Sequence, residues 1–91
     1  MMAMRDSTQR ARVSAVVPAH NEEQTIAGVV DVLVKHPMID EVIVVDDGSS
    51  DATAERARAA GATVLVLAEN SGKAAAMSRG VRAARNDIIF F

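Results

Sequence analysis

Short runs of β-branched and apolar residues alternate with helix-favouring segments along most of the chain, and this alternation limits the folds it can adopt. The apolar runs predict strands, and the segments between them predict helices. Helices of this length return the chain to the same edge of a sheet, so the pattern predicts an α/β fold with a Rossmann-like, doubly wound parallel sheet. The predicted strands are residues 13–18, 41–46, 63–67 and 87–91, and the predicted helices are residues 24–35, 52–60 and 74–84.

Several residues predict where the helices begin and end. Asn21 lies three residues before Gln24, which is the spacing of an N-cap and its reciprocal partner, so we expect Asn21 to cap the first helix. Ser50 or Asp51 is expected to cap the second helix. Gly61 follows that helix at the position of a left-handed C-terminal cap.

Size and composition exclude several classes of protein. A chain of 91 residues forms at most one small domain, which we place at residues 13–91 after a disordered tail at residues 1–12. The absence of cysteine excludes disulfides and thiolate catalysis and agrees with a cytoplasmic location. The net charge is −2, and basic and acidic residues are interspersed along the chain, so the sequence has no basic patch of the kind that binds nucleic acid. No apolar run is long enough for a membrane segment.

The last predicted strand carries both phenylalanines of the chain, Phe90 and Phe91, at its end. Complete domains normally cover an apolar edge strand. We therefore expect the sequence to be the front part of a longer domain, truncated after the fourth strand. An uncovered strand of this kind is also a route to self-association.

Polar residues gather where three of the predicted strands end, at residues 19–22, 46–50 and 69–73. In an open parallel sheet the ligand crevice lies beyond the carboxyl ends of the strands, so these loops predict a binding site. Two common phosphate-binding motifs are missing. No G-x-G-x-x-G follows the first strand, and Gly72-Lys73 lacks the other residues of a P-loop.

The three loops carry Pro-Ala-His-Asn-Glu-Glu at residues 18–23, Val-Val-Asp-Asp-Gly-Ser-Ser-Asp at 44–51 and Asn-Ser-Gly-Lys-Ala-Ala-Ala-Met-Ser-Arg-Gly at 70–80. In this order, and at strand ends, they resemble family 2 glycosyltransferases of the GT-A fold, and the resemblance runs over residues 13–91. It implies the N-terminal, nucleotide-sugar-binding part of an inverting enzyme. Such an enzyme transfers a sugar from a nucleoside diphosphate to a lipid, a saccharide or another acceptor.

The resemblance also implies a set of substrate-binding residues. In that family the first two loops hold the base and ribose of a UDP- or GDP-linked sugar. Glu22 would then reach the ribose or base, Asp47 would hydrogen-bond the base edge, and Lys73 would supply positive charge near the nucleotide. The implied residues are Pro18, Ala19, Asn21, Glu22, Asp46, Asp47, Gly48 and Lys73, of which Asp46 and Gly48 would hold the shape of their turn.

Members of the family hold Mg²⁺ or Mn²⁺ on the diphosphate with an Asp-x-Asp motif after the fourth strand, and use a later carboxylate as general base. Neither group is present in this sequence. We therefore assign no catalytic residue and no metal ligand within the chain, and expect the 91 residues alone to be inactive.

Simpler interpretations of the same residues stay open. Asn21 could serve only as a helix cap, Asp47 could cap the second helix, and Lys73 could be a surface residue. His20 is expected to be a loop residue or a wall of the base pocket rather than a general base. As a whole, the chain could be a non-catalytic remnant or interaction module. A phosphoacceptor receiver domain fits poorly, because its acidic pair would follow the first strand and not the second.

Overall fold

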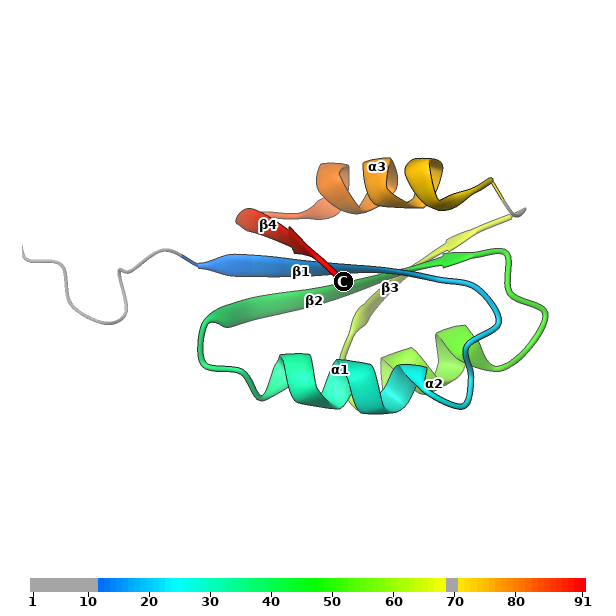
Figure 1. Cartoon of the computed structure of the whole chain (residues 1–91), viewed down its shortest axis with the longest axis horizontal. Coiled ribbons are helices and arrows are strands. Elements are labelled where there is room, and N and C mark those ends of the chain that lie inside the picture. Colours follow the sequence, from blue (N-terminus) through cyan, green and yellow to red (C-terminus); the bar gives the residue numbers. More distant parts are fainter. Residues whose placement is uncertain (1–11, 69–70) are drawn as a thin grey trace, which may run out of the picture.

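The computed structural model describes residues 12–68 and 71–91, which form four parallel strands and three helices. The sheet has the order β3-β2-β1-β4, so the predicted α/β, doubly wound class is confirmed (Figure 1). Most of the predicted tail, and Glu69 and Asn70 in the third polar loop, lie outside the described residues. The elements are β1 (Val13–Ala19), α1 (Ile26–Val34), β2 (Ile39–Asp47), α2 (Thr53–Ala60), β3 (Thr63–Leu67), α3 (Lys73–Ala83) and β4 (Asp87–Phe90).

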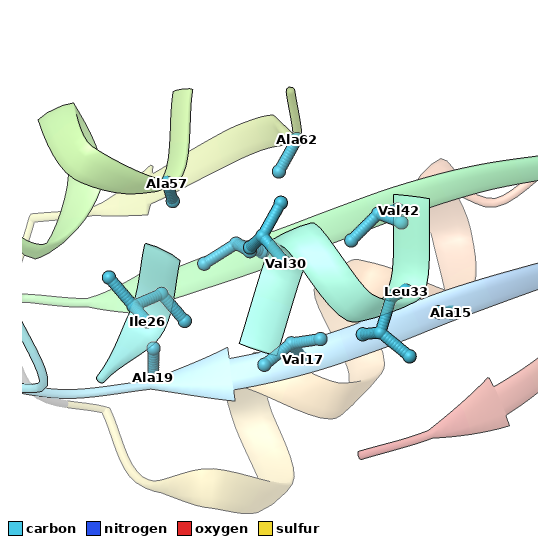
Figure 2. Close-up of a cluster of buried hydrophobic side chains, with 10 residues drawn as sticks. Ala15, Val17, Ala19, Ile26, Val30, Leu33, Val42, Ala57 and Ala62 are labelled. Atoms are coloured by element: carbon cyan, nitrogen blue, oxygen red, sulfur yellow. The ribbon is translucent and has the colours of Figure 1, made fainter. Parts of the chain in front are cut away.

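The winding direction reverses after β3, and this reversal places the helices on both faces of the sheet. Helices α1 and α2 cover one face, whereas α3 covers the other (Figure 1). Two apolar clusters result, one on each face. In the first, Ile26, Val30 and Leu33 of α1 pack with Ala15, Val17 and Ala19 of β1 (Figure 2). This spacing of apolar residues is the helical period that the sequence shows.

The second cluster brings α3 unusually close to the central strand. It consists of Val16, Ile43, Val45, Leu67 and Ala76. Gly80 of α3 lies directly over Val16, where a side chain on Gly80 would have no space. The close approach holds the first turn of α3, including Lys73, against the carboxyl ends of the strands.

The expectation that Asn21 caps the first helix is wrong. Helix α1 begins at Ile26, two residues later than predicted, and its N-cap Thr25 makes no side-chain cap hydrogen bond. The start is set instead by the carbonyl of Glu22, which accepts the N–H of Ile26 at 2.9 Å. By contrast, the predicted left-handed cap at Gly61 is confirmed, with a φ of 113°.

Strand β4 forms one edge of the sheet and leaves large apolar side chains exposed. Ile89, Phe90 and Phe91 retain 43%, 42% and 59% of their accessible surface. No helix within the described part of the chain is long and apolar enough to cross a membrane.

Candidate functional site

The carboxyl ends of β1, β2 and β3 lie side by side, as the parallel register requires. Ala19 at the end of β1 is paired with Asp46, and Asp47 is paired with Leu67 at the end of β3. The β1–α1 loop (residues 20–25) and the β2–α2 loop (residues 48–52) therefore leave the sheet at one rim, together with residues 68, 71 and 72 between β3 and α3. The expectation that the polar loops share an edge is correct.

A cavity of about 360 Å³ opens at this rim, between the strand ends and the first turn of α3. Five of the eight residues predicted to bind substrate line it, and the structure brings Glu22, Asp47 and Lys73 together there. Of the other three, Asn21 and Gly48 lie in the adjoining loops and Asp46 lies in β2, and none of them lines the cavity. Ala76 and Phe91 also line the cavity and were not singled out from the sequence. The full lining is Pro18, Ala19, His20, Glu22, Asp47, Lys73, Ala76 and Phe91.

Asp47 connects the β2–α2 turn to the loop before α3. Its carboxylate is buried and accepts the backbone N–H of Ser71 at 2.6 Å and that of Gly72 at 2.7 Å. A carboxylate has about four acceptor positions, so both oxygens keep capacity for a further donor. Because Gly72 precedes Lys73 directly, the Asp47 carboxylate also fixes where α3 begins.

His20 is held against the same turn by its ring. Its Nδ1 atom is 2.8 Å from the backbone carbonyl oxygen of Asp47, which can only accept, so Nδ1 carries the proton. Its Nε2 atom then accepts from the side-chain amide of Asn21 at 3.3 Å. The ring is thus an oriented wall of the cavity, as one of the sequence interpretations proposed.

Asp46 and Gly48 shape the turn that follows β2. One oxygen of the buried Asp46 carboxylate accepts the N–H of Ser49 at 3.0 Å, and this bond closes the turn on itself. Gly48 has a φ of 72°, a left-handed conformation that glycine adopts without steric cost. These contacts fit the turn-shaping roles expected for both residues.

Asn21 fastens the β1–α1 loop to the β2–α2 loop. It has a φ of 51°, which asparagine tolerates better than most residues. Its backbone N–H donates to Ser49 Oγ at 2.8 Å, and its Oδ1 accepts the backbone N–H of Ser50 at 2.8 Å. The Asn21 side chain is therefore engaged between loops and does not line the 360 Å³ cavity.

Behind Asn21 the same two loops are joined by a second, more buried set of bonds. The Glu23 N–H donates to Asp51 Oδ2 at 3.3 Å, and the Ala52 N–H donates back to Glu23 Oε1 at 3.2 Å. Thr53 is fully buried and links Glu22 to Asp51 through its hydroxyl. Hydrogen bonds from Thr53, above all from its hydroxyl, lower the pKa of Asp51 below its ordinary value. Asp51 also accepts the backbone N–H of Thr53, the first residue of α2. The N-cap of that helix is nevertheless Ala52, which makes no side-chain cap hydrogen bond, so the expectation that Ser50 or Asp51 caps α2 is wrong.

A different carboxylate, Glu41, lies near the amino end of β2, away from the rim that carries the cavity. Its side chain is 12% exposed. Its Oε1 accepts Ser14 Oγ–H at 2.6 Å and the N–H of Arg85 at 2.8 Å. Burial raises the pKa of Glu41, but the hydrogen bonds from Ser14 and Arg85 and the Arg85 charge outweigh it and leave the pKa below its ordinary value. This group ties the connection between α3 and β4 to the sheet, far from the cavity.

Lys73 is the first residue of α3 and is exposed at the cavity rim. Among the described residues no carboxylate forms a salt bridge with its ammonium group. Nor do the residues of 12–68 and 71–91 contain a group of three His, Cys, Asp or Glu side chains that could hold a metal ion. The cavity lining thus includes both a cation, Lys73, and a hydrogen-bond acceptor, Asp47.

Comparison with known proteins gives a consistent result. The family model described as "Glycosyl transferase family 2" matches residues 14–91. The chain is 42% identical over 88 residues to glucosyl-3-phosphoglycerate synthase of Mycolicibacterium paratuberculosis, covering 87% of this chain and 27% of that protein. It is 37% identical over 94 residues to dodecaprenyl-phosphate galacturonate synthase of Rhizobium johnstonii, covering 92% of this chain and 28% of that protein.

Solved structures agree with these sequence matches. Glucosyl-3-phosphoglycerate synthase from Mycobacterium tuberculosis, in complex with Mn²⁺, UDP-glucose and phosphoglyceric acid, superposes with a TM-score of 0.79 at 35% identity, covering 93% of this chain and 34% of that one. Mannosyl-3-phosphoglycerate synthase from Rubrobacter xylanophilus superposes with a TM-score of 0.77 at 33% identity, covering 88% of this chain and 30% of that one. The chain spans about a third or less of each protein.

Proposed function

Because the chain belongs to glycosyl transferase family 2, we propose that residues 13–91 form the nucleotide-sugar-binding part of a GT-A domain that transfers a sugar to a lipid, a saccharide or another acceptor. One observation carries the proposal: Glu22, Asp47 and Lys73, from three different loops or loop ends, line a single cavity. Its volume of about 360 Å³ lies in the range of small-molecule sites.

The chemistry of the lining suits a nucleoside diphosphate. Pro18 and Ala19 offer a flat apolar surface for a base, and the Asp47 carboxylate can accept an imide N–H in a charge-assisted hydrogen bond. The Glu22 carboxylate can accept hydrogen bonds from ribose hydroxyls, and the Lys73 ammonium group can attract the diphosphate. Uridine is the base we favour, since the mycobacterial enzyme that superposes on this chain was crystallised with UDP-glucose. Guanosine is the alternative.

A divalent cation is expected with this ligand, because the superposed mycobacterial enzyme was crystallised with Mn²⁺ or Mg²⁺ together with the nucleotide. The described residues of this chain do not fit one. They contain no three-residue cluster of metal-binding side chains, and the Asp46 and Asp47 carboxylates are already bonded to backbone amides. We therefore assign the cation ligands, the general base and the acceptor site to no residue of this chain.

Isothermal titration calorimetry tests the proposal directly. UDP or GDP is titrated into the folded chain in the presence of Mn²⁺ or Mg²⁺, with adenosine diphosphate as the comparison. We expect saturable binding of UDP or GDP that is stronger than binding of the adenine nucleotide. No binding of either ligand, both to this chain and to a longer protein that contains it, would rule the proposal out.

A second role, as an interaction module that self-associates, is favoured by one observation. Strand β4 is an edge strand with unpaired backbone groups; Ile89 and Phe90 are exposed on it, and Phe91 is exposed directly after it. We propose that a second copy can pair with this edge. Sedimentation of the wild-type chain and of Phe90→Asp checks it: the wild type should form concentration-dependent dimers that the variant lacks. We also propose that the protein is located in the cytoplasm, which cell fractionation tests.

A further inference from the structure

We infer, on the basis of the nucleotide site proposed above, that Thr53 is a positioning residue that holds Glu22 at the rim of the cavity. Thr53 is the first residue of α2 and has no exposed surface. It does not line the cavity. Any influence on a ligand must therefore pass through its neighbours.

The Thr53 hydroxyl both accepts and donates a hydrogen bond. Its oxygen accepts the backbone N–H of Glu22 at 2.8 Å, and its proton goes to Oδ1 of Asp51. The same Oδ1 atom accepts the Thr53 backbone N–H at 3.0 Å. One oxygen of Asp51 thus orients the hydroxyl, and the oriented hydroxyl presents a lone pair to Glu22. A hydroxyl with a fixed donor direction is a better-defined acceptor than one that rotates freely.

Glu22 is held on its other side as well. Its carbonyl oxygen accepts the N–H of Thr25 at 3.1 Å and that of Ile26 at 2.9 Å, which anchors it to the start of α1. The N–H is anchored to α2 by Thr53, so the peptide groups on both sides of the Glu22 Cα atom are fixed. This backbone sets the starting point of the exposed side chain at the cavity rim, and Oε1 of that side chain accepts the backbone N–H of His20 at 3.4 Å.

The bonding partner of Thr53 distinguishes its positioning role from general support of the fold. Asn21 also joins the two loops, but through its neighbours Ser49 and Ser50, whereas Thr53 bonds to the backbone of a cavity residue. Loss of the hydroxyl leaves the Glu22 N–H without its acceptor in a part-buried place. The loop then shifts to find another partner, and the carboxylate moves with it.

The experiment compares UDP affinity, with Mn²⁺ present, for the wild-type chain, Thr53→Val and Thr53→Ser. Valine keeps the shape of the side chain but removes the hydroxyl, whereas serine keeps the hydroxyl. We expect Thr53→Val to weaken UDP binding by about tenfold, the equivalent of one lost polar contact, and Thr53→Ser to bind like the wild type. Thr63→Val is the matched control, because Thr63 is exposed at the start of β3 on the opposite edge of the sheet. It should leave UDP affinity unchanged.

A second comparison separates positioning from a loss of stability. In a Glu22→Ala background, Thr53→Val should change UDP affinity less than twofold, because the side chain through which it acts is absent. An unchanged tenfold effect in that background would overturn the inference. So would wild-type affinity in folded Thr53→Val. If Thr53→Val does not fold, Thr53→Ala removes the same acceptor, and the same two outcomes decide.

Failure of the proposed function gives a different result. Binding of neither UDP nor GDP, both by the wild-type chain and by a longer protein that contains it, overturns the nucleotide site and the role of Thr53 with it. A wild-type chain that binds UDP while Thr53→Val binds it equally well overturns the role of Thr53 alone.

Discussion

Gly80 of α3 and Val16 of β1 are in such close contact that a Cβ atom on Gly80 would lie 2.2 Å from Cγ1 of Val16. Val16 is fully buried in the central strand and has no space to retreat. The pair therefore sets the distance between α3 and the sheet, and with it the position of Lys73, seven residues earlier in the same helix.

Gly80→Ala should destabilise the chain by about 1–3 kcal/mol, the usual effect of overpacking, even though alanine has the higher helix propensity. Chemical denaturation in urea measures the change. Gly28→Ala in α1 is the matched control, because a Cβ atom there meets nothing within 4 Å. It should raise stability by up to about 1 kcal/mol. Equal effects of both substitutions would show that the Gly80 contact is unimportant.

Asp47→Asn should lower UDP affinity at least tenfold. The asparagine side chain has one acceptor oxygen instead of two, so it cannot receive both the Ser71 and Gly72 amides and an imide N–H from a base. Calorimetry measures the affinity. Asp87→Asn removes the same charge from an exposed position at the start of β4 and should bind UDP normally. An Asp47→Asn chain with intact affinity would show that the base lies elsewhere.

Lys73→Gln should weaken binding of UDP while leaving binding of uridine nearly unchanged, because only the diphosphate carries charge for the ammonium group. The loss for UDP should be about tenfold in low salt and smaller in high salt, since screening weakens the attraction in the wild type. Lys35→Gln serves as the control. Lys35 pairs with Asp31 at the far end of α1 and should not affect either ligand. Equal losses for UDP and uridine would contradict the assigned role.

The free energy of unfolding should depend on pH because the pKa of Glu41 is lowered in the folded state. Its pKa in the folded state lies below the ordinary value of 4.5, so the unfolded chain binds more protons between the two values and stability rises with pH there. The stabilisation is complete above about pH 4.5 and is lost as the pH falls through the lowered value. Asp51 contributes in the same direction.

Thermal unfolding between pH 3 and pH 7 checks this expectation. Glu41→Gln should be less stable than the wild type at pH 7, and the difference should shrink toward pH 3. Glu55→Gln, which changes an exposed carboxylate of α2, should follow the wild-type curve. A constant difference between Glu41→Gln and the wild type across this range would exclude the proposed charge effect.

The strands and helices could be predicted from the sequence because their patterns are local. The run 42–45 is apolar throughout because β2 is covered on both faces, and Gly61 ends α2 because only a left-handed residue fits there. The start of α1 could not be predicted in this way. Asn21 has the composition of a cap, but its side chain is taken by Ser50, which is 29 residues away in the sequence.

The site was predictable to the same extent. Strand order places Glu22, Asp47 and Lys73 at one rim, so a resemblance that names them and a parallel sheet are enough to bring them together. Which loop residue faces the cavity and which faces another loop depends on contacts across 24 to 31 positions, such as that from Ser71 to Asp47 or from Glu22 to Thr53. No local pattern contains that information. The Asp-x-Thr spacing at residues 51–53 indicates the local hydrogen bond between Asp51 and Thr53, but not the contact from Glu22 to Thr53.

The amide groups around the acidic turn have an electrostatic consequence. The N–H dipoles of Ser49, Ser71 and Gly72 direct their positive ends at the carboxylates of Asp46 and Asp47 and offset part of their negative charge. The repulsion that two adjacent aspartates would exert on an approaching diphosphate is thereby weakened. The ammonium group of Lys73 adds a positive charge to the same rim, although the net charge of the chain is −2.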